Sequence, residues 1–315
     1  MYWFSNNLGD NLNYYLLNDM VKGQIKFFNR EFSRKKKFSW DKNNIIKLNE
    51  IAKIDFFFIG SILDTICNWS YIFHNPNNKY KTIISKPSKA LIIFGTGFIS
   101  SQNNQNESYI RNLKIIALRG NISLQRLRKN GVKLSKSVVL ADPGILAPML
   151  INISDISKLN NTKKYNLCII PHYIDAGKNK TIKNRIRVKN SIILNIESNP
   201  IKFLESMLQC QNVISSGLHG LIIADSLGIP NMRMVLSNKI LGGDYKFKDY
   251  SAYGLQLPPK INLHRTILTE KNLKYFKSIS KISNDIIKKK QCQLLLNFPF
   301  KLKKKYEIIK NIICN

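Results

Sequence analysis

Short apolar runs that end in turn residues and are followed by helical patterns recur along the whole chain. They lie at 56–59, 91–94, 115–118, 138–140, 167–170, 192–196 and in a run that begins at Val213. Strands that alternate with helices are typical of βα units, whose strands form a parallel sheet. The pattern therefore predicts an α/β fold with parallel sheets.

The length of 315 residues favours two domains, because single cores stop growing beyond about 250–300 residues. A polar connector near 152–164 is the predicted boundary. We therefore expect an N-terminal domain at 1–155 and a C-terminal domain at 156–315, with a cleft between them. The segment after about Thr269 has a basic, amphipathic helical pattern and is expected to form a C-terminal helical tail.

The formal net charge of +31 is compatible with nucleic acid, an anionic membrane or an acidic substrate as partner, but we interpret most of the excess as solvated surface. Lys far outnumbers Arg, and no stretch interleaves aromatic residues with Lys, so nucleic-acid binding is disfavoured. Lys288–Lys290 and Lys303–Lys305 leave peripheral contact with an anionic membrane open. There is neither an apolar run of about 18 residues nor a signal-peptide pattern. We expect a cytoplasmic protein that at most docks on the inner face of the cytoplasmic membrane.

The cysteines are five in number, widely scattered and never spaced as CxxC: Cys67, Cys168, Cys210, Cys292 and Cys314. This spacing argues against a disulfide framework and against a zinc site, so buried or idle thiols are expected. No helix carries His and carboxylate at a metal-binding spacing, and no metal is expected. The motif GTG at 95–97 is too short for a dinucleotide fingerprint, so no bound cofactor is expected either.

The stretch VISSGLHGLIIADSLGIP at 213–230 reads as a strand, a polar turn and a helix. Ser215 and Ser216 are expected to cap this helix, and Gly217 allows close approach of a ligand. A helix start attracts anions and favours the neutral form of a nearby imidazole. His219 in this turn is therefore the candidate acid–base group beside an anionic ligand.

Other polar residues follow predicted strands, where ligands bind in open α/β sheets. Arg119 precedes a helix start and is the candidate anion clamp. His172 lies in PHYID, where Asp175 can orient the imidazole or bind a sugar hydroxyl, although a structural His is nearly as compatible. Asp10 is equally explained as a helix cap, and Asp142 as a turn former.

Several motifs in this order resemble the polysaccharide pyruvyl transferase family. They are NLGDN at 7–11, GS at 60–61, FGTGF at 94–98, ALRG at 117–120, ADPG at 141–144, PHYID at 171–175, VISSGLHGLIIADSLGIP at 213–230 and GGDYKFKDY at 242–250. The resemblance covers most of the chain up to about Gly254. It implies two Rossmann-like domains with parallel sheets that face a central cleft, as in B-type glycosyltransferases.

The resemblance also implies the activity. Family members move pyruvate from phosphoenolpyruvate to a sugar of a cell-surface polysaccharide or of its lipid-linked precursor, as a ketal, and release phosphate. Arg119, Leu218 and His219 would contact phosphoenolpyruvate, and His172 would face the acceptor. Relatives often carry Ser or a cationic residue where this chain has Gly217, so Lys246 or Lys248 is expected to supply that contact.

The predicted catalytic residues are His219, Arg119 and His172, because ketal formation needs an acid–base group and a fixed clamp on the donor's charges. The predicted substrate contacts are Gly9, Asp10, Gly95, Asp142, Ser215, Ser216, Leu218, Lys246 and Asp249. Three alternatives stay open at this point: a B-type glycosyltransferase that uses a nucleotide sugar, a nucleic-acid-binding protein, and a family member inactivated at Gly217.

Overall fold

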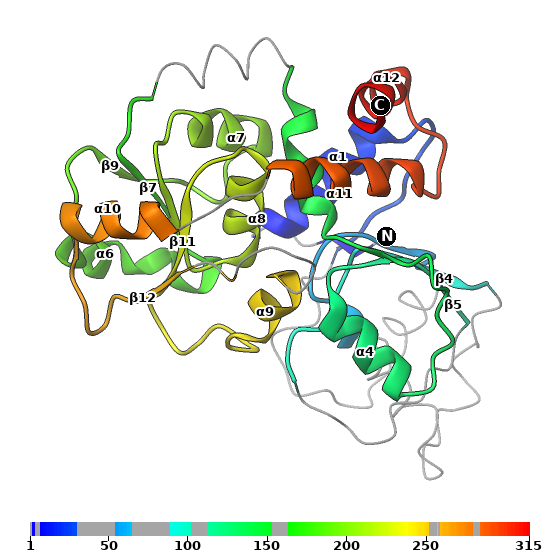
Figure 1. Ribbon diagram of the computed structural model, residues 1–315, viewed down its shortest axis with the longest axis horizontal. Coiled ribbons are helices and arrows are strands. Elements are labelled where there is room, and N and C mark those ends of the chain that lie inside the picture. The colour runs from blue at the N-terminus through cyan, green and yellow to red at the C-terminus, as the bar shows by residue number, and fades with distance from the viewer. Residues whose placement is uncertain are drawn as a thin grey trace.

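The computed structural model describes residues 2–3, 7–29, 54–64, 89–101, 112–152, 163–251, 257, 259–279 and 284–315. Within them the chain forms an α/β fold whose strands pair in parallel (Figure 1). The predicted fold class is confirmed at this level. Cys67 and His74 lie outside the described residues.

A sheet in the first half has four strands in the order β3-β4-β5-β6. These are β3 (Phe56–Phe57), β4 (Leu91–Phe94), β5 (Leu113–Leu118) and β6 (Val139–Leu140). The helical segments of this half are α1 (Leu8–Met20), α4 (Asn121–Lys129) and the 3-10 helix η2 (Pro143–Leu150). Asn7 caps α1, because its side chain accepts from the amide of Gly9.

A sheet in the second half has five strands in the order β12-β11-β10-β7-β9. These are β7 (Leu167–Ile170), β9 (Ser191–Ile193), β10 (Val213–Ser215), β11 (Asn231–Val235) and β12 (Lys260–Asn262). The helical segments are η3 (Tyr173–Lys178), α6 (Asn179–Arg185), α7 (Pro200–Leu208), α8 (Leu218–Ser226), α9 (Tyr245–Ser251) and α10 (Glu270–Ile279). Two short pairs complete the strands: β1 (Tyr2–Trp3) with β2 (Phe28–Asn29), and β8 (Ile186–Arg187) with β13 (Leu268–Thr269).

One apolar core connects the two sheets. It includes Phe94 and Val139 from the first sheet, Ile170 and Val213 from the second, and the inner faces of α1, η2, α7 and α8. Figure 1 shows α8 and α1 in the centre of the molecule, between the two sheets. Smaller clusters cover the outer face of each sheet. The largest apolar cluster of the described residues is therefore shared by the two halves, and α1 contacts α8 within it.

The tail forms α11 (Asn284–Leu296) and α12 (Lys304–Cys314), and α11 contacts η2 and β6 of the first half and α8 of the second. The amide of Lys303 donates to the carbonyl of Met20 at the end of α1 (2.8 Å). The Tyr306 hydroxyl donates to Asp19 (2.7 Å), and the Phe298 ring meets Phe94 edge-on. The tail was predicted as part of 156–315; it contacts α8 of that half and also packs on α1, η2 and β6 of the first half (Figure 1).

Tyr306 is fully buried, so truncation of its ring should loosen the tail. We expect Tyr306→Ala to lower the free energy of unfolding by about 3–5 kcal/mol. Ile312→Ala on the same helix is the control, because Ile312 is 59% exposed and its loss should cost less than about 0.5 kcal/mol. Urea unfolding followed by circular dichroism measures both, and equal midpoints would contradict this packing.

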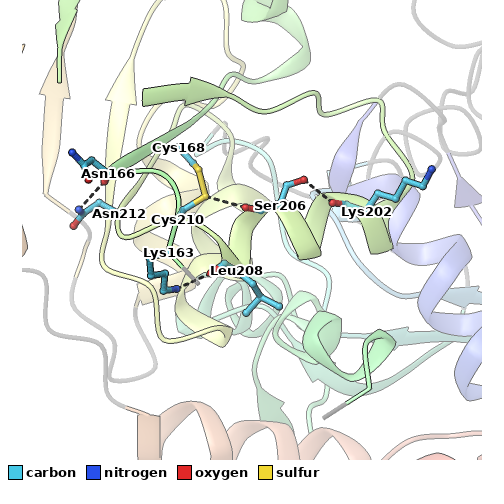
Figure 2. The surroundings of a disulfide bond; sticks show 8 residues. All are labelled: Lys163, Asn166, Cys168, Lys202, Ser206, Leu208, Cys210 and Asn212. Carbon is cyan, nitrogen blue, oxygen red and sulfur yellow. Dashed lines mark hydrogen bonds between the residues drawn. A yellow bond between two sulfur atoms is a disulfide. The ribbon is translucent and has the colours of Figure 1, made fainter. Parts of the chain in front are cut away.

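The prediction of buried free thiols is wrong for four of the cysteines. Cys168 is bonded to Cys210, and Cys292 to Cys314. Strands β7 and β10 are neighbours in the sheet, and this brings the Cα atoms of Cys168 and Cys210 to 5.8 Å. Figure 2 shows this bond beside the end of α7, where Cys210 Sγ lies 3.2 Å from the carbonyl oxygen of Ser206. The second bond joins α11 to α12.

Loss of the first disulfide should destabilise the fold, because its ends are 42 residues apart in sequence. We expect Cys210→Ala to lower the free energy of unfolding by about 4 kcal/mol under non-reducing conditions. Wild-type protein in dithiothreitol is the control and should lose at least as much. Alkylation of Cys168 and Cys210 in the native, non-reduced wild type, read by peptide mapping, would show that the bond does not form.

None of the described helices is both long and apolar enough to cross a bilayer.

Candidate functional site

A cavity lies where segments that follow strands of both sheets come together. The segment after β3 contributes Gly60 and Ser61, the segment after β7 contributes Pro171 and His172, and the turn after β10 leads into the start of α8. Its polar and charged lining residues are Asn7, Asp10, Ser61, His172, Tyr173, Ser215, His219 and Lys246. The carboxyl ends of parallel strands thus supply the site, as expected for an open α/β sheet.

His219, in the first turn of α8, is held between two glycines of the first half. A Cβ atom on Gly9 would overlap the imidazole ring on its Nδ1 side. A Cβ atom on Gly144 would lie 3.7 Å from Cδ2. The side chain is 14% exposed. Glycine at position 9 therefore allows α1 to approach the ring closely, and this packing holds the imidazole in one place.

Asp142, the N-cap of η2, faces the other nitrogen of His219. Its Oδ1 accepts from the amide of Gly144 (2.9 Å), and its Oδ2 lies 4.0 Å from Nε2 of His219. Both atoms are buried, and neither Oδ2 nor Nε2 has a hydrogen-bond partner among the residues that the structure describes. The distance is too long for a hydrogen bond.

The surroundings of this pair set the charge of each group. Burial, followed by the charges of Lys246 and Arg119, lowers the pKa of His219 to about 3. Burial raises the pKa of Asp142 to about 6, with Asp249 adding to the rise and the Gly144 amide and Arg119 opposing it. At neutral pH the imidazole is therefore neutral and the Asp142 carboxylate is mostly ionised.

No side chain caps the start of α8, and the predicted capping role of Ser215 and Ser216 is wrong. Gly217 is the N-cap residue. Ser215 Oγ accepts from the Gly217 amide and donates to the carbonyl oxygen of Ile170. Ser216 Oγ donates to Asp175 and accepts from the His172 amide. The positive end of α8 therefore lies at the cavity, with Leu218 and His219 in its lining.

His172 is the N-cap residue of η3, and its Nδ1 accepts from the amide of Ile174 (3.3 Å). Its ring packs against Tyr173, with 4.4 Å between the ring centroids. Asp175 was predicted to orient this imidazole or to bind a hydroxyl. Instead its buried carboxylate accepts from Ser216 and Ser237. Asp175 therefore stabilises the turn that carries Ser216, while the His172 ring lines the cavity.

Arg119, the predicted clamp, is fully buried and lies behind the cavity wall. Its Nε donates to Asp249 (3.0 Å), and another guanidinium nitrogen donates to the carbonyl of Phe98. The third nitrogen donates to Ser61 Oγ (2.5 Å), and Ser61 lines the cavity. The guanidinium therefore reaches the cavity through Ser61.

Asp249, a predicted substrate contact, occupies a site that suits an anion. Its Oδ1 accepts from the amide of Ser123 at the start of α4 (2.9 Å), and its Oδ2 accepts from Ser123 Oγ and Arg119. The carboxylate therefore anchors α9 to the first half. On the same helix Lys246, 7% exposed, lines the cavity. The ion pair between Asp249 and Arg119, which lies outside the cavity, thus fixes the helix that brings Lys246 to the cavity.

Two further predicted residues have different positions. Asp10, in the first turn of α1, lines the cavity beside Gly60. Gly95 packs under Pro143 with a φ angle of 81° and does not line this cavity, so its role is to allow a tight turn after β4. Ser61 was not singled out as a site residue, although its place two residues after the predicted strand at 56–59 is a signal that could have found it.

Comparison with known proteins supports the resemblance. Residues 4–238 match the sequence profile of polysaccharide pyruvyl transferase. The chain belongs to the polysaccharide pyruvyl transferase family. A relative is the uncharacterized protein L143 of Acanthamoeba polyphaga mimivirus, which is 32% identical over 191 residues. That match covers 59% of this chain and 63% of the mimivirus protein, so the chain spans less than two thirds of its relative's length.

Two solved structures are similar at low identity. A UDP-GlcNAc 2-epimerase of Methanocaldococcus jannaschii, in complex with UDP-GlcNAc and UDP, has a TM-score of 0.46 and 11% identity, covering 100% of this chain and 99% of that one. The uncharacterized protein KP1_0663 of Klebsiella pneumoniae has a TM-score of 0.37 and 12% identity, covering 83% of this chain and 91% of that one.

The contact between Gly9 and His219 makes a prediction for this family member. We expect Gly9→Ala to lower the free energy of unfolding by about 1–3 kcal/mol, because the new methyl group must displace the imidazole. Alanine is otherwise favoured in a helix. Gly177→Ala is the control, because a Cβ atom there would meet nothing within 4 Å. If the two variants unfold at the same urea concentration, α1 and the His219 ring are not in contact.

Proposed function

We propose that this chain transfers pyruvate from phosphoenolpyruvate to two hydroxyl groups of a sugar, as a cyclic ketal, with release of phosphate. The acceptor belongs to a cell-surface polysaccharide or its lipid-linked precursor. Family membership supports the reaction type. The observation that carries the proposal is a neutral, immobilised imidazole in a cavity that also holds Lys246 and the uncapped start of α8.

The donor is a small anion with a phosphate and a carboxylate. Lys246 and the start of α8 both place positive charge at the cavity, and their effect is strong because little water reaches them. Ser61 adds a hydroxyl that accepts from Arg119, which leaves its own proton to donate to the ligand. His172 and Asp10 then face the sugar hydroxyls.

The chemistry needs one mobile proton at the donor. The methylene carbon of phosphoenolpyruvate gains a proton and becomes the ketal methyl group. The adjacent carbon forms bonds to two hydroxyl oxygens, and its bond to the phosphate oxygen breaks. Of the two hydroxyl protons, one ends on the methyl carbon and the other on phosphate. His219 takes the first from a hydroxyl and passes it to the methylene carbon, a role worth about 10²–10⁴ in rate.

This proposal extends to the architecture. The two parallel sheets would be the cores of two Rossmann-like domains that face each other across the cavity, as in B-type glycosyltransferases. The cavity lining supports this arrangement, since it is shared between segments after β3 and segments after β7 and β10. The competing donor for such an architecture is a nucleotide sugar.

Donor binding tests the proposal without knowledge of the acceptor. Phosphoenolpyruvate should raise the melting temperature and bind in calorimetry, and Lys246→Met should weaken it by about 10–100-fold because a charged hydrogen bond is lost. Lys248→Met, on the exposed side of the same helix, is the matched control.

His219→Gln should retain donor binding and lose phosphate release with a panel of glycosides. Stabilisation by nucleotide sugars and not by phosphoenolpyruvate would replace this proposal with the glycosyltransferase.

A further inference from the structure

Two buried polar atoms without partners face each other at the cavity: Nε2 of His219 and Oδ2 of Asp142, 4.0 Å apart. A buried polar atom that makes no hydrogen bond costs about 1–3 kcal/mol. If two such atoms approached by roughly 1 Å, one hydrogen bond between them would remove the cost of both. The two atoms are therefore placed to form a hydrogen bond after a small approach, although at 4.0 Å they do not yet form one.

The other contacts of Asp142 and His219 among the described residues leave Oδ2 and Nε2 as each other's hydrogen-bond partner. Asp142 lies two residues after the end of β6, and its Oδ1 is bound to the Gly144 amide, so Oδ2 is aimed at the ring. The ring is enclosed by Gly9 on the Nδ1 side and by Gly144 near Cδ2. Nε2 is sealed from solvent, whereas Nδ1 lies against Gly9, whose neighbours Leu8 and Asp10 line the cavity.

From this geometry we infer that Asp142 and His219 form a dyad in which Asp142 accepts the Nε2 proton and Nδ1 is the atom that exchanges protons with substrate. Asp142 is then a positioning residue that acts through His219, in place of the direct substrate contact that its sequence position suggests. It holds one tautomer of the ring and stabilises the imidazolium after Nδ1 has taken a proton.

The charges around the pair agree with this tautomer. Asp142 is mostly ionised at neutral pH and His219 is neutral, so the single ring proton is drawn to Nε2. Burial, followed by the charges of Lys246 and Arg119, lowers the pKa of His219 and so disfavours a second proton on the ring in the resting state. The mobile proton on Nδ1 is therefore present only while it is being transferred.

The tautomer can be measured directly, because the chain has four histidines. Long-range ¹H–¹⁵N spectra at pH 7.5, with the His219 signals assigned by their loss in His219→Gln, should show a protonated Nε2 and an unprotonated Nδ1. In Asp142→Asn the amide can donate to Nε2, so the proton should move to Nδ1. Asp225→Asn is the matched control: it removes another buried carboxylate, on α8 itself, and should leave the tautomer unchanged.

Only the assignment of Nδ1 to proton transfer rests on the proposed function, and it has its own readout. Asp142→Asn should lower kcat by about 10²–10⁴-fold with the KM for phosphoenolpyruvate changed by less than about threefold, and Asp142→Glu should restore part of the rate. A wild-type spectrum with the His219 proton on Nδ1 overturns the dyad even if neither Asp142 variant folds. Absence of any turnover with phosphoenolpyruvate, with the Nε2–H tautomer present, overturns the proposed reaction and leaves the dyad intact.

Discussion

The buried ion pair between Arg119 and Asp249 joins the two halves of the chain behind the cavity. Both side chains are fully buried, and the carboxylate also binds the start of α4. Removal of one partner from such a pair typically costs about 3–5 kcal/mol, because the other charge is left buried and unpaired. The pair therefore fixes where α9 lies against the first half, and with it the position of Lys246 at the cavity.

Strands with a continuous apolar pattern could be predicted from the sequence more readily than a strand that polar residues interrupt. The predicted runs at 91–94 and 167–170 match β4 and β7 in both bounds. Strand β11 was missed because Asn231 and Arg233 interrupt its apolar pattern. In the fold Asn231 binds Asp225, and Arg233 binds Asp244 and stacks over Phe247. Such partners are distant elements that no local pattern specifies.

The candidate site was predictable in its position and less so in its contacts. His172, His219 and Lys246 all line the cavity, two of them because they follow strand ends. The sequence also indicated that Arg119 would hold an anion beside a helix start. That anion is the Asp249 carboxylate, 130 residues away along the chain, which local spacing cannot reveal. For the same reason the sequence did not reveal the bond between Cys168 and Cys210, because it depends on β7 and β10 being neighbours in the sheet.

The position before the Leu218–His219 pair shows how these contacts combine. Gly217 is the N-cap of α8 and brings no side chain to the cavity, and a Cβ atom there would make only ordinary contact with His172 at 3.5 Å. Crowding therefore does not require glycine, and its effect is to leave the helix start open to a ligand. Lys246 supplies a cation to the same cavity from α9. The turn before α8 has no cationic side chain at position 217, and α9 places Lys246 at the same cavity instead. The position of α9 depends in turn on the ion pair between Arg119 and Asp249.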